Sequence, residues 1–166
     1  ETIRSARFFG TTGYFVTFRQ TDPLFSVDLS DPENPKVLGE LKISGFSSYL
    51  HFYGENLLLG IGYEADENTG STTGLKLSMF DISDPANVKE VSRTVLPGMT
   101  WCPAIEDYKS ILVDPDKNLI GFYCDKRYFV YSYDETGGFT RELLCDFYGD
   151  EFLGVSDQAG QEQGTS

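Results

Sequence analysis

Positive charge is scarce in this chain. It carries 13 Lys and Arg residues against 26 Asp and Glu, which gives a formal net charge of −13 at pH 7. Proteins that bind nucleic acids or anionic membranes need a basic surface, because much of their affinity comes from displaced phosphate counterions. No run of apolar residues approaches the roughly 20 that cross a bilayer. The composition therefore argues against a nucleic-acid partner and predicts no membrane insertion, and we attribute the acidity to solubility.

Cysteine and histidine, which hold most transition-metal sites, are also rare. The chain has one histidine and three cysteines, Cys102, Cys124 and Cys145, with no C-x-x-C pair among them. Zinc-binding cysteines usually occur in such closely spaced pairs. An odd number of cysteines cannot pair completely within one chain. We therefore expect three free, partly buried thiols and a fold that needs no metal, cofactor or disulfide.

Catalytic motifs are missing as well. The sequence contains no G-x-S-x-G, H-E-x-x-H or P-loop pattern, and it lacks the S-x-D-x-G-x-T-W box of sialidase propellers. A mechanism with a histidine base would have to use His51. Paired carboxylates for glycoside hydrolysis stay an alternative, because 26 acidic residues place some pairs close together. No pair stands out, and the sequence predicts a protein that is not an enzyme.

What the chain does contain is one segment that occurs twice. Residues 24–35 and 77–88 share the pattern hydrophobe-Asp-hydrophobe-Ser-Asp-Pro-x-Asn, and the first aspartates of the two copies are 53 residues apart. A period of this length is typical of stacked units such as solenoid repeats or propeller blades. Asp31 and Asp84 are expected to cap turns by accepting backbone N–H groups, and the following prolines preset φ. A calcium loop needs more converging oxygens, so we interpret the repeat as a structural turn.

Alternating segments rich in Phe, Tyr and β-branched residues predict strands along the chain. A helix over residues 86–95 is disfavoured because the repeat places Pro35 opposite Val88. The expected strands are 5–9, 14–19, 24–29, 36–43, 48–53, 57–63, 75–82, 89–96, 110–113, 119–124, 128–133 and 139–147. They predict an all-β fold of four-stranded antiparallel β-propeller blades, about three in a row, at residues 4–44, 45–97 and 106–150. Residues 151–166 are expected to form a polar tail or linker.

Four side chains are candidates for ligand or partner contact. Tyr49, His51 and Tyr53 alternate along the predicted first strand of the second unit, so they share one face, and that strand is the one nearest a propeller axis. A structural or channel-lining role for His51 is the alternative to ligand contact. Trp101 lies in the connection between the second and third units, where binding residues often occur. It is expected either to cap the core between blades or to stack on a sugar or partner.

Several stretches resemble a known family. These are YFVTFRQTDPLFSVDLSDPENPKVLGELKI at 14–43, GFSSYLHFY at 45–53, NLLLGIG at 56–62 and DYKSILVDPDKNL at 107–119. They are similar to the bacterial secreted beta-propeller domain family, which is distantly related to WD40 repeats, over roughly residues 4 to 150. The resemblance implies a propeller fold and an extracytoplasmic, secreted or cell-surface location. It implies no catalytic residues, because the biochemical role of that family is mostly unassigned.

Together these observations predict a non-enzymatic binding or scaffolding module whose partner is a protein or a cell-surface polymer. The alternative is a carbohydrate-active or carbohydrate-binding propeller. The chain begins without methionine or a signal-like segment, so we expect it to derive from a longer or processed precursor. Propellers close with typically four to eight blades, and apolar residues occur at both ends, in Phe8-Phe9 and Phe147-Tyr148. We therefore expect self-association through the terminal blades, most simply as a homodimer or by strand exchange between copies. The alternative is a monomeric arc with the polar tail folded over its open face.

Overall fold

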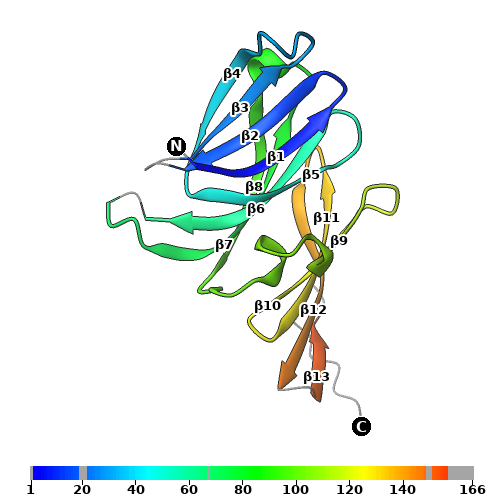
Figure 1. Cartoon of the computed structure of the whole chain (residues 1–166). Coiled ribbons are helices and arrows are strands. Elements are labelled where there is room, and N and C mark those ends of the chain that lie inside the picture. The colour runs from blue at the N-terminus through cyan, green and yellow to red at the C-terminus, as the bar shows by residue number, and fades with distance from the viewer. Residues whose placement is uncertain (1, 19–21, 67, 149–150, 157–166) are drawn as a thin grey trace. The chain divides into compact units, whose positions relative to one another are not determined.

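The structure is a computed structural model that describes the chain except for residues 1, 19–21, 67, 149–150 and 157–166 (Figure 1). The chain divides into two compact units, residues 1–98 and residues 99–166. The described residues form thirteen strands and three one-turn 3₁₀ helices, which confirms the all-β fold predicted from the sequence. None of these helices is long and apolar enough to cross a membrane.

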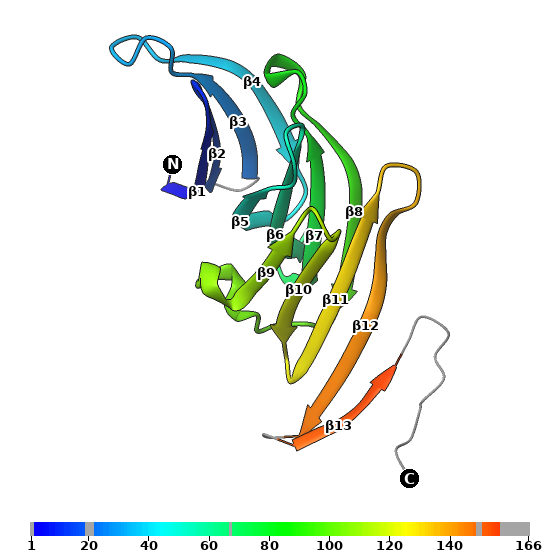
Figure 2. The same cartoon turned by 90° about the vertical axis from the view of Figure 1, so that its right-hand side faces the viewer.

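The first unit consists of two four-stranded antiparallel sheets, visible in Figure 2. Each sheet follows the chain order, with every strand paired to the next, as in a propeller blade. The first sheet contains β1 (Thr2–Phe9), β2 (Thr12–Phe18), β3 (Asp22–Asp28) and β4 (Lys36–Ile43). The second contains β5 (Phe46–Phe52), β6 (Leu57–Ala65), β7 (Thr72–Asp81) and β8 (Lys89–Pro97). We call these sheets blade 1 and blade 2.

One hydrophobic core joins blade 1 to blade 2. It contains buried side chains of both sheets: Tyr14, Val16, Leu24, Ile43, Leu50, Leu58, Phe80 and Ile82. Alternation along β2 directs Tyr14 and Val16 to the same face. Burying each large apolar side chain contributes about 1.5–3 kcal/mol, so this shared core fixes the two blades against each other.

The second unit consists of one five-stranded antiparallel sheet, which we call blade 3. Its strands are β9 (Ile111–Asp114), β10 (Leu119–Cys124), β11 (Arg127–Asp134), β12 (Gly138–Tyr148) and β13 (Glu151–Ser156). Two 3₁₀ helices, η2 (Pro103–Ile105) and η3 (Tyr108–Ser110), precede the sheet. Phe122 is stacked on both Phe129 and Tyr131, with ring centroids 5.5 and 6.1 Å apart, so aromatic packing dominates one face.

Strand β13 corrects the expectation of a polar tail from residue 151. It pairs with β12 in antiparallel register, with Cys145 opposite Val155 and Phe147 opposite Phe152. A strand at the edge of a sheet leaves a row of unpaired N–H and C=O groups, and this segment satisfies those of β12. The sequence carries little sign of this strand, because its few apolar residues are followed directly by the long polar stretch 157–166. Residues 157–166 themselves lie outside the described part of the chain.

All twelve strands expected from the sequence are present, with ends shifted by a few residues. The rejected helix over 86–95 is indeed absent: η1 (Pro85–Asn87) is a single 3₁₀ turn, and β8 follows it. The three short helices were not predicted. Each closes a turn between strands, and one turn is too short to leave a periodic pattern in the sequence.

The Asp-Pro turns confirm their predicted caps. Glu33 donates its backbone N–H to Asp31 at 3.1 Å, and Ala86 donates its backbone N–H to Asp84 at 3.0 Å. Each carboxylate thus accepts a backbone N–H that the turn would otherwise leave unpaired.

A second set of turn aspartates occurs once in every blade. Asp28, Asp81 and Asp134 each accept the backbone N–H two residues ahead, at 2.9, 2.9 and 2.7 Å. The step from Asp81 to Asp134 repeats the 53-residue step from Asp28 to Asp81, so the repeat has a third member that sequence analysis missed. Hydrogen bonds hold the pKa of all three carboxyl groups below the ordinary value. The largest contribution comes from the Ser30 backbone for Asp28, the Ser83 side chain for Asp81 and the Gly137 backbone for Asp134.

The second Asp-Pro turn is also a joint between blades. Helix η1 packs on β3 and β4 of blade 1, and the Ser26 hydroxyl donates a hydrogen bond to the Pro85 carbonyl. A Cβ atom on Gly39 would lie only 3.1 Å from the Ala86 carbonyl oxygen and 3.2 Å from that of Pro85. We call Ser26 and Gly39 the socket, because together they receive this turn.

Candidate functional site

The first strands of blades 1 and 2 are neighbours, and a polar cluster lies where they meet. Strand β1 contacts β5 and supplies Arg7, whose guanidinium carbon lies 5.0 Å from the centroid of the Tyr49 ring. On β5, the Tyr49 hydroxyl is hydrogen-bonded to Nδ1 of His51 at 2.8 Å. Because β-strand alternation directs residues i and i+2 to one face, the sequence predicted the Tyr49–His51 pair. We call Arg7, Tyr49 and His51 the first-strand cluster.

Electrostatics keep His51 neutral near pH 7. Burial lowers the pKa of His51 first, because it penalises the charged imidazolium, and the positive charge of Arg7 lowers that pKa further. The cluster thus combines one cation, one neutral imidazole and one phenol. A histidine that acts as a general base is usually oriented by a carboxylate at its other nitrogen, whereas here a phenol bonds Nδ1. The arrangement suits binding better than proton transfer.

The sequence analysis named Tyr53 as a candidate contact residue but did not name Arg7. Tyr53 comes directly after β5 and is buried, and its N–H donates to the Leu57 carbonyl at 2.8 Å to close the β5–β6 turn. Arg7 was not a candidate, because nothing local marks it. Only the adjacency of two first strands, which is a property of stacked blades, brings it over an aromatic residue 42 positions later.

Trp101 belongs to a row of aromatic side chains in the second unit. Its side chain is 58% exposed and meets Tyr123 edge-on, with centroids 6.0 Å apart. Tyr123 in turn contacts Phe147 at 6.5 Å. The carboxylate of Asp125 accepts the backbone N–H of Trp101 at 3.2 Å and thereby fixes the residue's position. An exposed indole on a connector that is hydrogen-bonded to the β10–β11 turn suits stacking contacts.

A buried lysine in blade 2 forms a further charged cluster. The Lys76 side chain is 1% exposed, its ammonium donates to the Ser44 carbonyl, and it lies 3.9 Å from Glu64 Oε2. Arg93 lies 3.6 Å from the other Glu64 oxygen. These contacts tie the link between β4 and β5 to the middle of blade 2. We assign the cluster a structural role, because Glu64 lies between the two cations and the buried ammonium is hydrogen-bonded to a backbone carbonyl.

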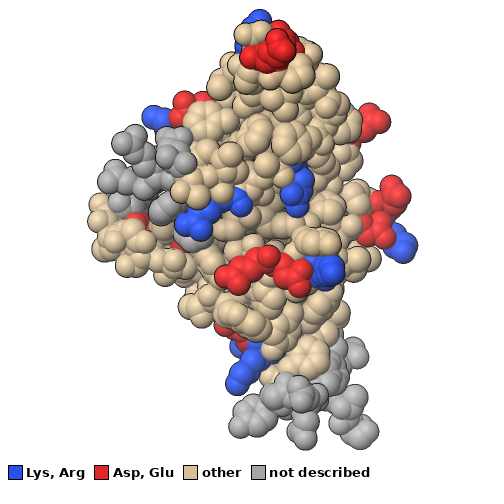
Figure 3. Space-filling model, in the orientation of Figure 1, with Lys and Arg blue, Asp and Glu red and all other residues tan. Residues whose placement is uncertain are grey.

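Charged side chains of both signs share the surface seen in Figure 3, with neutral surface between them. Within the described part of the chain, no three His, Cys, Asp or Glu side chains gather in a way that would hold a metal ion.

Comparisons with known proteins identify the family. The family model described as a beta propeller domain matches residues 1–146. A protein of Archaeoglobus fulgidus is 38% identical over 98% of this chain, and one of Methanocaldococcus jannaschii is 49% identical over 69% of it. Both are described as uncharacterized proteins.

This chain spans 27% and 17% of the lengths of those two relatives. Both organisms are archaea, so the bacterial source that the resemblance suggested is not supported. The family model covers most of the chain, and the observed sheets have the strand order of propeller blades. The chain therefore belongs to the beta propeller domain family.

Proposed function

We propose that this chain is a non-enzymatic binding module that recognises acidic groups of a protein or polymer through the first-strand cluster. One observation carries the proposal: Arg7, Tyr49 and His51 come together from the first strands of two adjacent blades. In closed propellers, blades are arranged around a central channel. A guanidinium over an aromatic ring, beside a neutral imidazole, offers several donors to a carboxylate.

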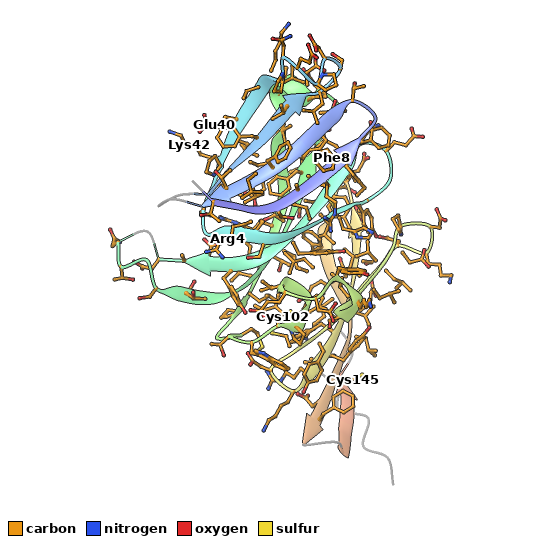
Figure 4. The ribbon with its side chains drawn as sticks, in the orientation of Figure 1. Arg4, Phe8, Glu40, Lys42, Cys102 and Cys145 are labelled. Atoms are coloured by element: carbon orange, nitrogen blue, oxygen red, sulfur yellow. The ribbon has the colours of Figure 1, made fainter. Side chains whose placement is uncertain are left out.

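The single histidine provides the test. In a two-dimensional NMR spectrum of the imidazole protons, only His51 contributes, so added poly-L-glutamate should shift its signals. We expect this shift to disappear in Arg7→Gln and to persist in Lys42→Gln. Lys42 is an exposed cation on β4 of the same unit (Figure 4), so it controls for general charge. Equal losses in both variants, or no shift in the unchanged protein, would overturn the proposal.

The absence of catalysis is tested separately. A panel of chromogenic esterase, phosphatase and glycosidase substrates should be turned over no faster than in buffer. Turnover that one acidic-to-amide substitution abolishes would instead establish an enzyme with a carboxylate mechanism.

Carbohydrate binding is a second candidate, and the exposure of Trp101 favours it. Aromatic side chains offer flat apolar surfaces for stacking, and Trp101, Tyr123 and Phe147 form a connected row. Because Trp101 is the only tryptophan, its fluorescence reports on this row directly. A shift on adding cell-wall or plant polysaccharides, lost in Tyr123→Ala, would support this function. An unchanged spectrum across the panel would count against it.

We further propose an extracytoplasmic location and self-association. The location rests on the family resemblance of residues 14–62, and fractionation of cells that produce the full-length protein tests it. Self-association is supported by β1, on which Ile3, Phe8 and Phe9 are 60%, 58% and 54% exposed. Light scattering coupled to size exclusion should then give twice the 18.6 kDa chain mass, and a single species of monomer mass would exclude the dimer.

A further inference from the structure

The connector that leads into blade 3 lies along the end of β10. The Asp125 N–H donates to the Trp101 carbonyl at 3.1 Å, and the N–H groups of Thr100 and Trp101 donate to the Asp125 carboxylate. Residue 101 therefore lies opposite residue 125. The Asp125 side-chain carboxylate accepts the Trp101 N–H, which in a regular antiparallel pair would donate to the backbone carbonyl of residue 125. In an antiparallel arrangement the next opposing pair is Cys102 and Cys124.

The thiols of this opposing pair are in contact. The Cys124 thiol interacts with that of Cys102 and also donates to Asp125 Oδ2 at 3.9 Å. Cys102 and Cys124 are only 3% and 0% exposed. Opposing residues that are not themselves linked by backbone hydrogen bonds have Cα atoms about 4.5 Å apart. A disulfide needs a Cα separation of about 4.4–6.8 Å, so this register can hold the bond without moving the backbone.

We propose that Cys102 and Cys124 form an intramolecular disulfide on reaction with a low-molecular-weight disulfide. The second unit thus contains a pair of thiols that can be oxidised reversibly. The connector is thereby fastened covalently to the β10–β11 hairpin. Cys145 stays reduced, because its backbone partner on β11 is Tyr128, whereas that of Cys124 is Arg127, one residue earlier. Successive residues of a strand direct their side chains to opposite faces.

The two cysteines have different roles in the reaction. The hydrogen bond from Cys124 lowers the pKa of Cys102, whereas that same bond, together with burial, raises the pKa of Cys124. Cys102 also lies on the connector outside the strands, whereas Cys124 ends β10, so we assign Cys102 as the attacking thiolate. It displaces one small thiol from the reagent and forms a mixed disulfide. Cys124 then gives up its proton, attacks the Cys102 sulfur and displaces the second small thiol.

The reaction balances without any other reactant. Two protein thiols lose two electrons and two protons, and the small disulfide gains both and leaves as two thiols. Because Cys102 is buried, the reaction with the reagent requires the connector to move away from the β10–β11 hairpin. Figure 4 shows Cys102 on the connector and Cys145 on β12.

Incubation of the native chain with glutathione disulfide tests the inference. After denaturation and alkylation, we expect the count of free thiols to fall from three to one, and peptide mapping to recover Cys102 linked to Cys124. Cys145→Ser should form the same link, which then leaves no free thiol. Three persistent thiols, or a link that involves Cys145, would overturn the proposal.

Single variants separate the two roles. Cys124→Ser should accumulate a stable glutathione adduct on Cys102, whereas Cys102→Ser should accumulate little adduct on Cys124. The same oxidation in concentrated urea controls for loss of structure in these variants, because an unfolded chain has no preference for this pair. A link that forms no more selectively in the native protein than in urea contradicts the inference.

Discussion

The two copies of the repeated twelve-residue segment have the same turn but different surroundings. In blade 1, residues 31–38 are all exposed, and Asn34 bonds back to Asp31 through both its backbone and its side chain. In blade 2, the equivalent turn forms η1, which packs on β3 and β4. Both aspartates make the predicted cap, but the first turn is exposed, whereas the second packs on another sheet.

The comparison separates local from tertiary determinants. Hydrogen bonds within the turn depend on the Asp-Pro sequence alone, because the aspartate and its N–H partners are close neighbours in the chain. Docking depends on the socket, which lies about 50 residues earlier in the sequence. A repeated turn can thus act as a joint wherever the preceding blade offers a small residue and a hydroxyl.

Filling the socket should have the largest effect. In Gly39→Val, the new side chain would meet the carbonyl oxygens of Pro85 and Ala86, which lie within 3.2 Å of a Cβ at this position. We expect a loss of about 1–3 kcal/mol in the free energy of unfolding, as for other overpacked sites. Urea denaturation measures it. Glu40→Val, at the exposed next position, controls for β-propensity, and equal stability of the two variants would contradict the socket.

Removing the caps compares the two turns directly. Asp84→Ala should destabilise the protein by roughly 1–2 kcal/mol, in the range of lost helix caps, because η1 must keep its shape to dock. Asp31→Ala should cost less, because its turn is exposed. The difference in urea midpoint between the two variants is the measurement. A larger loss for Asp31→Ala would mean that docking contributes nothing to the role of the cap.

The hydroxyl of the socket should contribute a smaller amount. Ser26→Ala leaves the Pro85 carbonyl without this donor, and we expect a cost of about 1 kcal/mol. Ser78 is a matched control, because it is equally buried on β7 and its hydroxyl has no hydrogen-bond partner among the described residues. Ser78→Ala should therefore be neutral or slightly stabilising in thermal unfolding. Equal effects of the two substitutions would disprove the Ser26–Pro85 contact.

Low pH should weaken the turns of all three blades alike, and we expect this loss of stability to be smaller than those of the variants above. Asp28, Asp81 and Asp134 have pKa values below the ordinary 3.8 in the folded state. The unfolded chain then binds more protons as the pH falls below about 4, so this stabilisation is present above that pH and lost below it. Replacing all three by Asn keeps the acceptors and should flatten the fall of Tm.

A control variant for the acid experiment removes the same number of negative charges. The triple amide change at three exposed turn or loop positions, Glu33, Glu55 and Glu135, removes the same charge without removing a capped carboxylate. Its Tm should fall with acid as steeply as that of the unchanged protein, and a curve as flat as that of the aspartate variant would argue against the turn bonds.

The parts of the fold that the sequence predicted are local. Alternation of residue types predicted twelve strands, all of which are present. It also predicted that Tyr49 and His51 share one face of their strand, and their side chains are hydrogen-bonded. Strand β13 was missed because its apolar residues adjoin a long polar stretch. Asp134 was missed because its turn has no proline, although its spacing from Asp81 was available.

The missed parts of the candidate sites are non-local. Arg7 reaches Tyr49 only because the first strands of two blades adjoin, and Cys102 reaches Cys124 only because the connector pairs with the end of β10. Lys76 sits in an apolar strand, and its burial depends on a carbonyl 32 residues earlier. A single sequence carries no signal for such pairings, which arise when sheets and connectors pack.

The single histidine and the single tryptophan fall in different units, His51 in residues 1–98 and Trp101 in residues 99–166. Each unit therefore carries one spectroscopic reporter that the other lacks. Imidazole proton signals follow the melting of blades 1 and 2, and indole fluorescence follows that of blade 3, in one unlabelled sample. Coincident transitions would show that the units unfold as one cooperative block, and separate transitions would resolve two.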